Sequence, residues 1–208
     1  MRVEFFGISG VGKTTIAKKY VSEQVKKGYV VVWPWNKLYT KSNWFFRNIK
    51  KSRWVLRRLI LHFFWCKQLF CVLKKLDISL RDTAKLFYNG IYLKESFNSN
   101  KYDYIYVYDE GVVQYLYAIY LRAEELPRYE LVDKIIKLFG CPEKIIVVRS
   151  DANVIKKRLE NRNRKTRILE TNDLLGDIIK LQDIEKKILD ILVMYFVDYE
   201  QIDIYCNN

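Results

Sequence analysis

The chain has 208 residues, 50% of them hydrophobic, and a formal net charge of +13 at pH 7. This length suits a single large domain, or a domain with an insertion, that buries about 70% of the surface of its unfolded chain. Four cysteines without C-x-x-C spacing and a single histidine make a poor zinc-binding set. The N-terminal residues lack the pattern of a secretory signal, so we expect a cytoplasmic protein.

Residues 7–14 read Gly-Ile-Ser-Gly-Val-Gly-Lys-Thr and match the phosphate-loop pattern G-x-x-x-x-G-K-[ST]. The apolar run over 2–6 predicts a buried strand and residues 15–21 predict a helix, which is the order that such a loop requires. The glycines let the backbone approach phosphates closely, and the helix N-terminus adds a partial positive charge. We expect ATP or another nucleoside triphosphate to bind through Gly7, Ser9, Gly10, Val11, Gly12, Lys13, Thr14 and Thr15.

Two side chains of this loop have predicted chemical roles. Lys13 would reach the β and γ phosphates as a point charge, and the Thr14 hydroxyl would bind Mg²⁺. The alternative is a glycine-rich turn that matches the pattern by chance and binds no nucleotide. The flanking strand and helix favour nucleotide binding.

The positive charge is concentrated in the next part of the chain. Between Gln24 and Leu76 there is no Asp or Glu, and the segment carries 13 basic residues, whereas the other 24 basic residues are matched by 24 acidic ones. The segment also contains all the tryptophans, which are Trp33, Trp35, Trp44, Trp54 and Trp65. We therefore predict a basic, tryptophan-rich helical insert over 37–76 within one domain over 1–208, and an anionic partner for the insert.

Further elements follow in chain order. A β-branched run over 30–33 predicts a second strand that ends at Pro34, and residues 43–76 are predicted to be mainly helical. Between Trp54 and Phe70 the apolar residues are too numerous for one helix face, which predicts burial on several sides. A helix over 78–87 is predicted to continue over 90–97 after a local break. Later strands are predicted over 104–108, 144–148 and 201–205, and later helices over 112–125, 128–139, 151–161 and 172–194.

This alternation of strands and helices predicts an α/β fold with a parallel sheet covered on both faces. A nucleotide is expected beyond the carboxyl ends of the strands. Asp109 directly follows the strand over 104–108, so we expect it to hold Mg²⁺ together with Thr14. Glu110 could accept a proton from an acceptor hydroxyl or orient a water molecule. Asp-Glu-Gly after a strand is also an ordinary turn sequence.

An arginine cluster follows the fourth strand. Arg158 and Arg162 are four residues apart on a predicted helix, where they would repel each other unless an anion lies between them. A transferring phosphoryl group is such an anion, and guanidinium groups match its geometry. The cluster predicts phosphate contacts from Arg158, Arg162, Arg164 and Arg167; the alternative is a solvated basic face.

Four segments together resemble the thymidylate kinase and deoxynucleoside kinase group of P-loop proteins, which are similar to nucleoside monophosphate kinases. These segments are Phe6–Thr15, Leu86–Asn89, Tyr106–Glu110 and Val147–Arg164, which look like the phosphate loop, the third helix, the third strand with its terminal acid, and the fourth strand with its lid. The resemblance implies a three-layer α/β/α fold with a five-stranded parallel sheet and an arginine-bearing lid over 150–170. It also implies transfer of the ATP γ-phosphoryl group to a small acceptor.

The sequence departs from this group near the acceptor. Thymidylate kinases usually carry Asp-Arg after the third strand and deoxynucleoside kinases Glu-Arg, whereas this chain has Asp109-Glu110. The segment Trp33–Asn36 lacks the glutamate that deoxynucleoside kinases use as a base. The insert occupies the acceptor region of the group, and its basic and aromatic residues could surround an anionic or aromatic small molecule. The candidates for that contact are Arg47, Lys50, Lys51, Arg53, Arg57 and Arg58.

The leading hypothesis is an ATP- and Mg²⁺-dependent phosphotransferase, with Lys13 and the arginines stabilising the transferring group and Glu110 as base. A second hypothesis is a nucleotide-switched module in which ATP or GTP hydrolysis controls binding to nucleic acid or to an acidic membrane surface. In a third hypothesis, the insert is a pair of helices buried in the interface of a homodimer. The sequence leaves the acceptor and the preferred nucleotide open.

Overall fold

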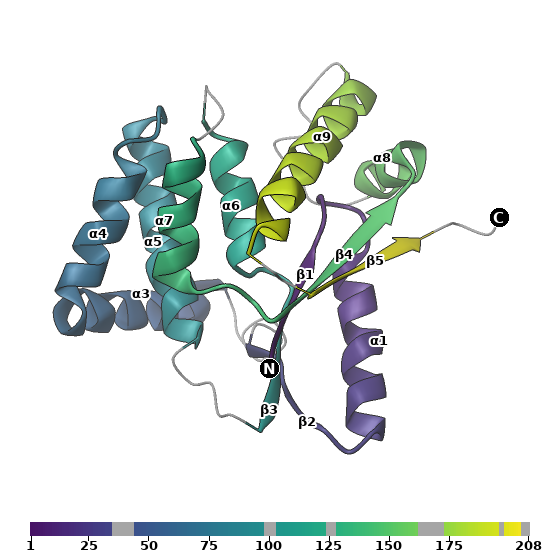
Figure 1. Cartoon of the computed structure of the whole chain (residues 1–208), viewed down its shortest axis with the longest axis horizontal. Helices are drawn as coiled ribbons and strands as arrows, with labels where there is room; N and C mark the ends of the chain where they lie inside the picture. The colour runs from purple at the N-terminus through teal and green to yellow at the C-terminus, as the bar shows by residue number, and fades with distance from the viewer. Residues whose placement is uncertain (35–43, 98–102, 124–127, 162–172, 196–197, 205–208) are drawn as a thin grey trace.

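Five parallel strands form a single sheet at the centre of the molecule. The computed structural model describes residues 1–34, 44–97, 103–123, 128–161, 173–195 and 198–204 (Figure 1). The strand order is β2-β3-β1-β4-β5, and each neighbouring pair is parallel. The strands are β1 (Arg2–Phe6), β2 (Val30–Val32), β3 (Tyr104–Tyr108), β4 (Lys144–Ser150) and β5 (Asp198–Ile204). The predicted α/β fold with a five-stranded parallel sheet is confirmed.

The sheet is apolar because helices cover both of its faces. In the central strand β1, Val3, Phe5 and Phe6 are buried, and in β4 every residue from Ile145 to Val148 is buried. Helix α1 (Lys13–Lys26) lies on one side of the sheet, whereas α6 (Val112–Tyr120) and α9 (Leu174–Val193) lie on the other (Figure 1). This is the pattern of a parallel sheet between two helical layers. The carboxyl ends of its strands therefore meet at one edge.

The remaining described helices extend the molecule to one side and over the top of the sheet. They are α3 (Trp44–Leu61), α4 (Phe63–Leu73), α5 (Leu80–Phe97), α7 (Tyr129–Phe139) and α8 (Ala152–Glu160). Helices α3, α4 and α5 stand together at the end of the molecule away from β5 (Figure 1). None of the helices in the described part of the chain is both long and apolar enough to cross a bilayer.

Several predicted boundaries were wrong; for example, α1 extends to Lys26 and β4 to Ser150, beyond the predicted ends at 21 and 148. Helix α5 continues through Gly90 without the predicted break. A glycine suits this position because a Cβ there would lie 2.8 Å from the Tyr115 hydroxyl. Helix α6 ends at Tyr120, five residues before the predicted end at 125. Strand β5 begins at Asp198 rather than at 201, and its first residues pair with β4 although they are polar. An edge strand tolerates such residues because solvent reaches it.

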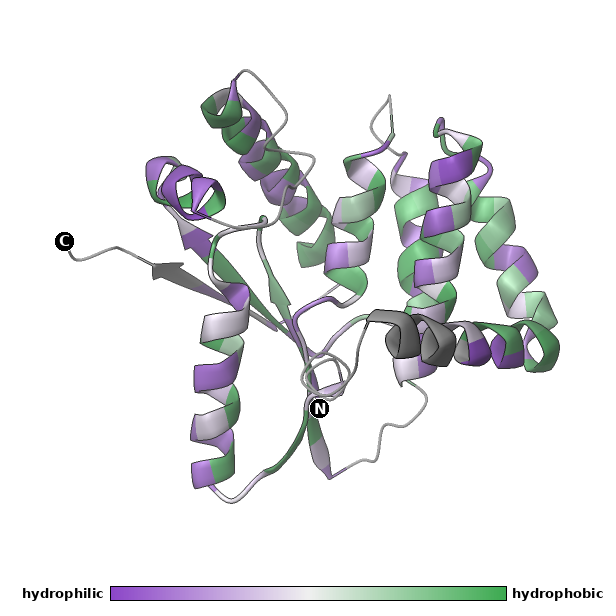
Figure 2. Cartoon of the chain, turned by 180° about the vertical axis from the view of Figure 1, so that it is seen from behind, coloured by the Kyte–Doolittle hydropathy of each residue, from purple (hydrophilic) through white to green (hydrophobic). Residues whose placement is uncertain are grey.

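The helices of the insert were predicted correctly from Trp44 onward, but their burial was not. The side chains of Leu56, Ile60, Phe63 and Phe64 are 60–79% exposed, although burial on several sides was predicted. Within the described residues, α3 and α4 pack on each other and on α5, and α4 also packs on α7, which leaves their outer surface uncovered. In the hydropathy view, green (hydrophobic) and purple (hydrophilic) segments alternate along the described part of α3, which ends in green (Figure 2).

Candidate phosphate-binding site

The glycine loop (residues 7–14) connects β1 to α1 at the carboxyl edge of the sheet. Gly7, Gly10 and Gly12 all have positive φ, as the loop pattern predicts. Gly12 is the N-cap of α1, with φ 108° and ψ 15°, a left-handed conformation that L side chains rarely adopt. This conformation turns the chain abruptly from the loop into the helix. The N-terminus of α1, with its partial positive charge, therefore faces the carboxyl edge of the sheet.

A cavity of about 320 Å³ opens at this helix N-terminus, and we call it the phosphate cavity. It is lined by Ser9, Gly10, Gly12, Lys13, Thr14, Thr15, Asp109, Glu110, Gln114 and Tyr117. Most of the predicted loop residues therefore share one space with the two predicted carboxylates. Two loop residues do not line it: Gly7 and Val11 are buried, and a Cβ on Gly7 would collide with the carbonyl of Val148.

The Lys13 side chain folds over the loop that it follows. Its Nζ donates to the carbonyl oxygens of Gly7 and Ile8, the second at 3.0 Å, and the side chain lines the phosphate cavity. An ammonium group held in this way is a point charge beside a helix N-terminus. Both features attract an anion.

Asp109 faces two partners with its two carboxylate oxygens. Oδ2 lies 3.4 Å from Oγ1 of Thr14, and Oδ1 accepts a hydrogen bond of 3.3 Å from the indole Nε1 of Trp33. A hydroxyl and a carboxylate beside a phosphate cavity are the hard oxygen donors that Mg²⁺ prefers. Thr14 and Asp109 therefore have the chemistry that suits the ion that the sequence predicted.

Glu110 lies between the phosphate cavity and a neighbouring one. The second cavity, of about 220 Å³, is called the acceptor cavity below and is lined by Asn89, Tyr92, Leu93, Glu110, Gly111, Gln114, Tyr115 and Ala118. Glu110 and Gln114 line both spaces. A carboxylate at such a junction can reach groups that occupy either cavity.

Of the predicted arginines, the structure describes only Arg158. This residue lies on α8, and its Nη1 donates to the carbonyl of Val11 across 2.8 Å, so the guanidinium group contacts the glycine loop. Arg162, Arg164 and Arg167 lie outside the described residues, as does the predicted lid beyond Asn161.

The structure places one basic residue of the insert differently from the prediction. Arg58, a candidate for acceptor contact, is buried, and its Nη1 pairs with Oε2 of Glu95 at 2.9 Å. An internal ion pair of this kind fastens α3 to α5. Arg53 and Arg57 are exposed. The side chains of Arg47, Lys50 and Lys51 are outside the described part of the chain.

Sequence reasoning missed two residues that support the site. Trp33 was predicted to end the second strand and was given no role in the site, yet it is buried just after β2 and donates a hydrogen bond to Asp109. Glu185, on α9, is buried beneath the glycine loop, where its carboxylate hydrogen-bonds the backbone of Ile8 and pairs with Nε of Arg149 at 2.8 Å. Burial raises the pKa of Glu185, while Arg149 and Lys13 oppose that shift. The sequence offered one signal for Glu185: this glutamate stands at helical spacing among the apolar residues Ile178, Leu181, Ile188 and Leu192.

No family model matches the sequence, and no curated protein matches it. Solved structures do. A deoxyadenosine kinase from M. mycoides with bound dATP is 14% identical, with a TM-score of 0.51 over 98% of this chain and 91% of that one. A thymidylate kinase from Ehrlichia chaffeensis is 15% identical, with a TM-score of 0.50 over 100% of this chain and 90% of that one. The chain has the fold of these two kinases.

Proposed function

We propose that the protein is an ATP- and Mg²⁺-dependent phosphotransferase that moves the γ-phosphoryl group to a small acceptor. The observation that supports this most directly is the sharing of Glu110 and Gln114 by two adjoining cavities, one at the glycine loop and one beside it. A nucleotide-hydrolysing switch needs only the first cavity. A kinase needs a second space from which an acceptor meets the phosphate.

The residues of the phosphate cavity have complementary roles in this proposal. The glycine loop and the N-terminus of α1 hold the triphosphate, and Lys13 neutralises charge on its β and γ phosphates. Thr14 and Asp109 would hold Mg²⁺, which when bound shields the negative charge of the phosphates. Arg158, which already contacts the loop, stabilises the charge that develops on the transferring group.

Glu110 is the base in this proposal. Its position at the junction lets the carboxylate accept the proton of an acceptor hydroxyl in the acceptor cavity, so the oxygen can attack the γ phosphorus in the phosphate cavity. The bond from the γ phosphorus to the bridging oxygen breaks, and ADP leaves with that oxygen. Gln114, which borders both spaces, orients the acceptor.

The lining of the acceptor cavity favours an uncharged, aromatic acceptor. It offers the amides of Asn89 and Gln114 and the rings of Tyr92 and Tyr115, and none of its described lining residues is Lys or Arg. Amides and rings recognise a planar molecule with hydrogen-bonding edges. Of the two acceptor classes that the sequence suggested, the anionic and the aromatic, the described residues support the second.

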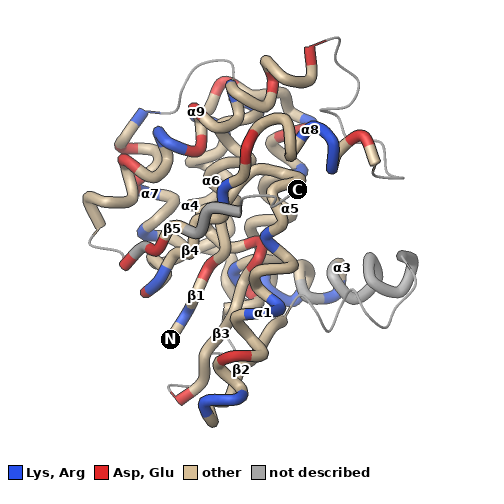
Figure 3. Tube along the Cα trace, turned by 90° about the vertical axis from the view of Figure 1, so that its right-hand side faces the viewer, with Lys and Arg blue, Asp and Glu red and all other residues tan. Residues whose placement is uncertain are grey.

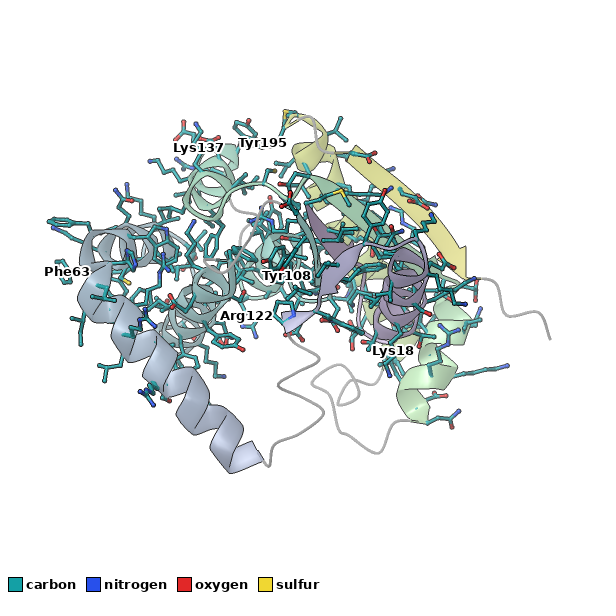
Figure 4. The ribbon with its side chains drawn as sticks, turned by 90° about the horizontal axis from the view of Figure 1, so that it is seen from below. Lys18, Phe63, Tyr108, Arg122, Lys137 and Tyr195 are labelled. Carbon is teal, nitrogen blue, oxygen red and sulfur yellow. The ribbon has the colours of Figure 1, made fainter. Side chains whose placement is uncertain are left out.

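The decisive experiment incubates the protein with MgATP and a metabolite extract and searches by mass spectrometry for a new phosphorylated compound. The Lys13→Ala variant should not form it. Lys18→Ala is the matched control, because Lys18 is exposed on α1, outside the cavity lining, and should leave product formation unchanged (Figure 4). Release of ADP at a rate independent of the extract, without a phosphorylated product, would instead support the switch.

A further inference from the structure

The outer end of the insert carries a cluster of exposed apolar side chains. We define the α3–α4 corner by Leu56, Ile60, Leu61, Phe63 and Phe64, whose exposed fractions are 60%, 71%, 61%, 61% and 79%. Figure 4 shows Phe63 at the edge of the molecule, pointing away from it, whereas Tyr108 lies in the interior. Single exposed apolar residues are common, but a contiguous group indicates an interaction surface.

Basic residues flank these apolar side chains on the same surface. Arg53, Leu56, Arg57 and Ile60 have i, i+3, i+4, i+7 spacing, so two exposed guanidinium groups share a face of α3 with two exposed aliphatic groups. On α4, exposed Lys67 is four residues after Phe63 and three after Phe64. No acidic residue occurs between Gln24 and Leu76, and the described part of α3 shows blue without red in the charge view (Figure 3).

This combination selects among the anionic partners that a basic surface can bind. Nucleic acid recognition uses aromatic stacking and phosphate contacts, which leave Leu56, Ile60 and Leu61 without a role. A second copy of the chain would bring the same Arg and Lys side chains face to face, and like charges oppose such an interface. A bilayer with acidic headgroups satisfies both features, because apolar tips enter the acyl boundary while basic groups remain among the headgroups.

We propose that the α3–α4 corner docks the protein on the surface of a membrane that contains anionic lipids. Leu56, Ile60, Leu61, Phe63 and Phe64 insert at the interface, and Arg53, Arg57 and Lys67 contact the headgroups. The phosphate cavity lies at the carboxyl edge of the sheet and shares no lining residue with the corner. Docking therefore leaves nucleotide binding possible.

The test measures co-sedimentation of the full chain with phosphatidylcholine vesicles prepared with and without phosphatidylserine. The protein should bind the phosphatidylserine vesicles, and binding should fall steeply as salt is added. The double variant Phe63→Ala/Phe64→Ala should bind at least about 10-fold more weakly, because apolar area no longer enters the interface. Arg53→Glu and Arg57→Glu should each weaken binding at least about 5-fold.

Matched controls separate the corner from general effects of charge and exposure. Leu80→Ala removes a side chain that is 77% exposed elsewhere, and Lys186→Glu reverses an exposed charge on α9. Both should bind vesicles like the unmodified protein. Unchanged ATP affinity in the Phe63→Ala/Phe64→Ala variant shows that it is folded.

Four results would overturn the proposal. Equal binding to both vesicle types would show that docking does not require an anionic lipid. Full binding by the Phe63→Ala/Phe64→Ala variant, or stronger binding to duplex DNA that this variant retains, would assign the surface to polyanions in general. A dimer in lipid-free solution that the same variant dissociates would assign it to self-association.

Discussion

The indole Nε1 of Trp33 donates a hydrogen bond of 3.3 Å to Oδ1 of Asp109. It thereby joins the end of β2 to the end of β3 and fixes one oxygen of the carboxylate, while the other oxygen lies 3.4 Å from the Thr14 hydroxyl. A partner behind a metal-binding carboxylate sets the direction in which the free oxygen points. Trp33 is therefore a positioning residue for the proposed Mg²⁺ site.

Replacing Trp33 by Phe keeps the aromatic ring and removes the donor. We expect the affinity for Mg²⁺ in the presence of ATP to fall about 10- to 100-fold, as for other residues behind a metal ligand. Calorimetric titration of Mg²⁺ measures this change, and metal-free ATP binding should stay the same. Trp65→Phe is the control, since it also loses an indole hydrogen bond, to Leu138 at 3.0 Å, but away from the cavity. Equal Mg²⁺ affinity in the two variants would contradict the positioning role.

Arg158→Ala tests the arginine beside the glycine loop. The turnover number should fall about 10²- to 10³-fold, because one charged donor to the transferring group is lost. The melting temperature should change little, since the side chain is only half-buried. Lys157→Ala, an exposed neighbour on α8, should keep full activity. A lower melting temperature with unchanged turnover would make the contact of Arg158 with Val11 purely structural.

Glu185→Ala removes the acceptor beneath the loop. Ile8 then loses a hydrogen bond and Arg149 an ion pair, so the free energy of unfolding should fall by about 1–3 kcal/mol. Because the loop backbone is less well held, the Kd for ATP should rise about 10-fold. Gln201→Ala is the control: Gln201 accepts from Arg149 at 2.9 Å but lies on β5, outside the lining of the phosphate cavity. If both variants bind ATP equally well, Glu185 does not position the loop.

Lys94 should make stability depend on pH. Burial, reinforced by the charges of Arg58 and Arg2, lowers the pKa of Lys94 from 10.5 to about 8 in the folded protein. Between these two pH values the unfolded chain binds more protons, so this residue makes the free energy of unfolding rise with pH. Below pH 8 both states are protonated and the full cost of burying the charge remains.

The Lys94→Met variant isolates this contribution. Its free energy of unfolding, measured by urea denaturation, should exceed that of the unmodified protein near neutral pH. The difference should shrink as the pH rises above about 8, since the unmodified protein then folds with a neutral Lys94. A difference that stays constant between pH 8 and 10 would mean that Lys94 is not desolvated in the folded protein.

The elements of the site that the sequence predicted are those with a local cause. The glycine loop is contiguous, and its turn depends on residues that accept positive φ, so its form is written into a few adjacent positions. Asp109 could be placed because it follows an apolar strand, and parallel strands in one sheet share an edge. The alternation of strands and helices likewise determined the fold class.

The supporting residues could not be predicted in this way. Trp33 reaches Asp109 only because β2 lies beside β3 in the strand order, and Glu185 reaches Ile8 only because α9 returns under the glycine loop. The exposure of Phe63 and Phe64 depends equally on which surfaces the neighbouring helices cover. The sequence alone determined the phosphate loop, the terminal acid and the parallel α/β architecture, because backbone conformation and hydrophobic periodicity are local. Only the tertiary structure decided which distant side chains support them and which apolar residues stay in water, because packing joins residues that the chain keeps far apart.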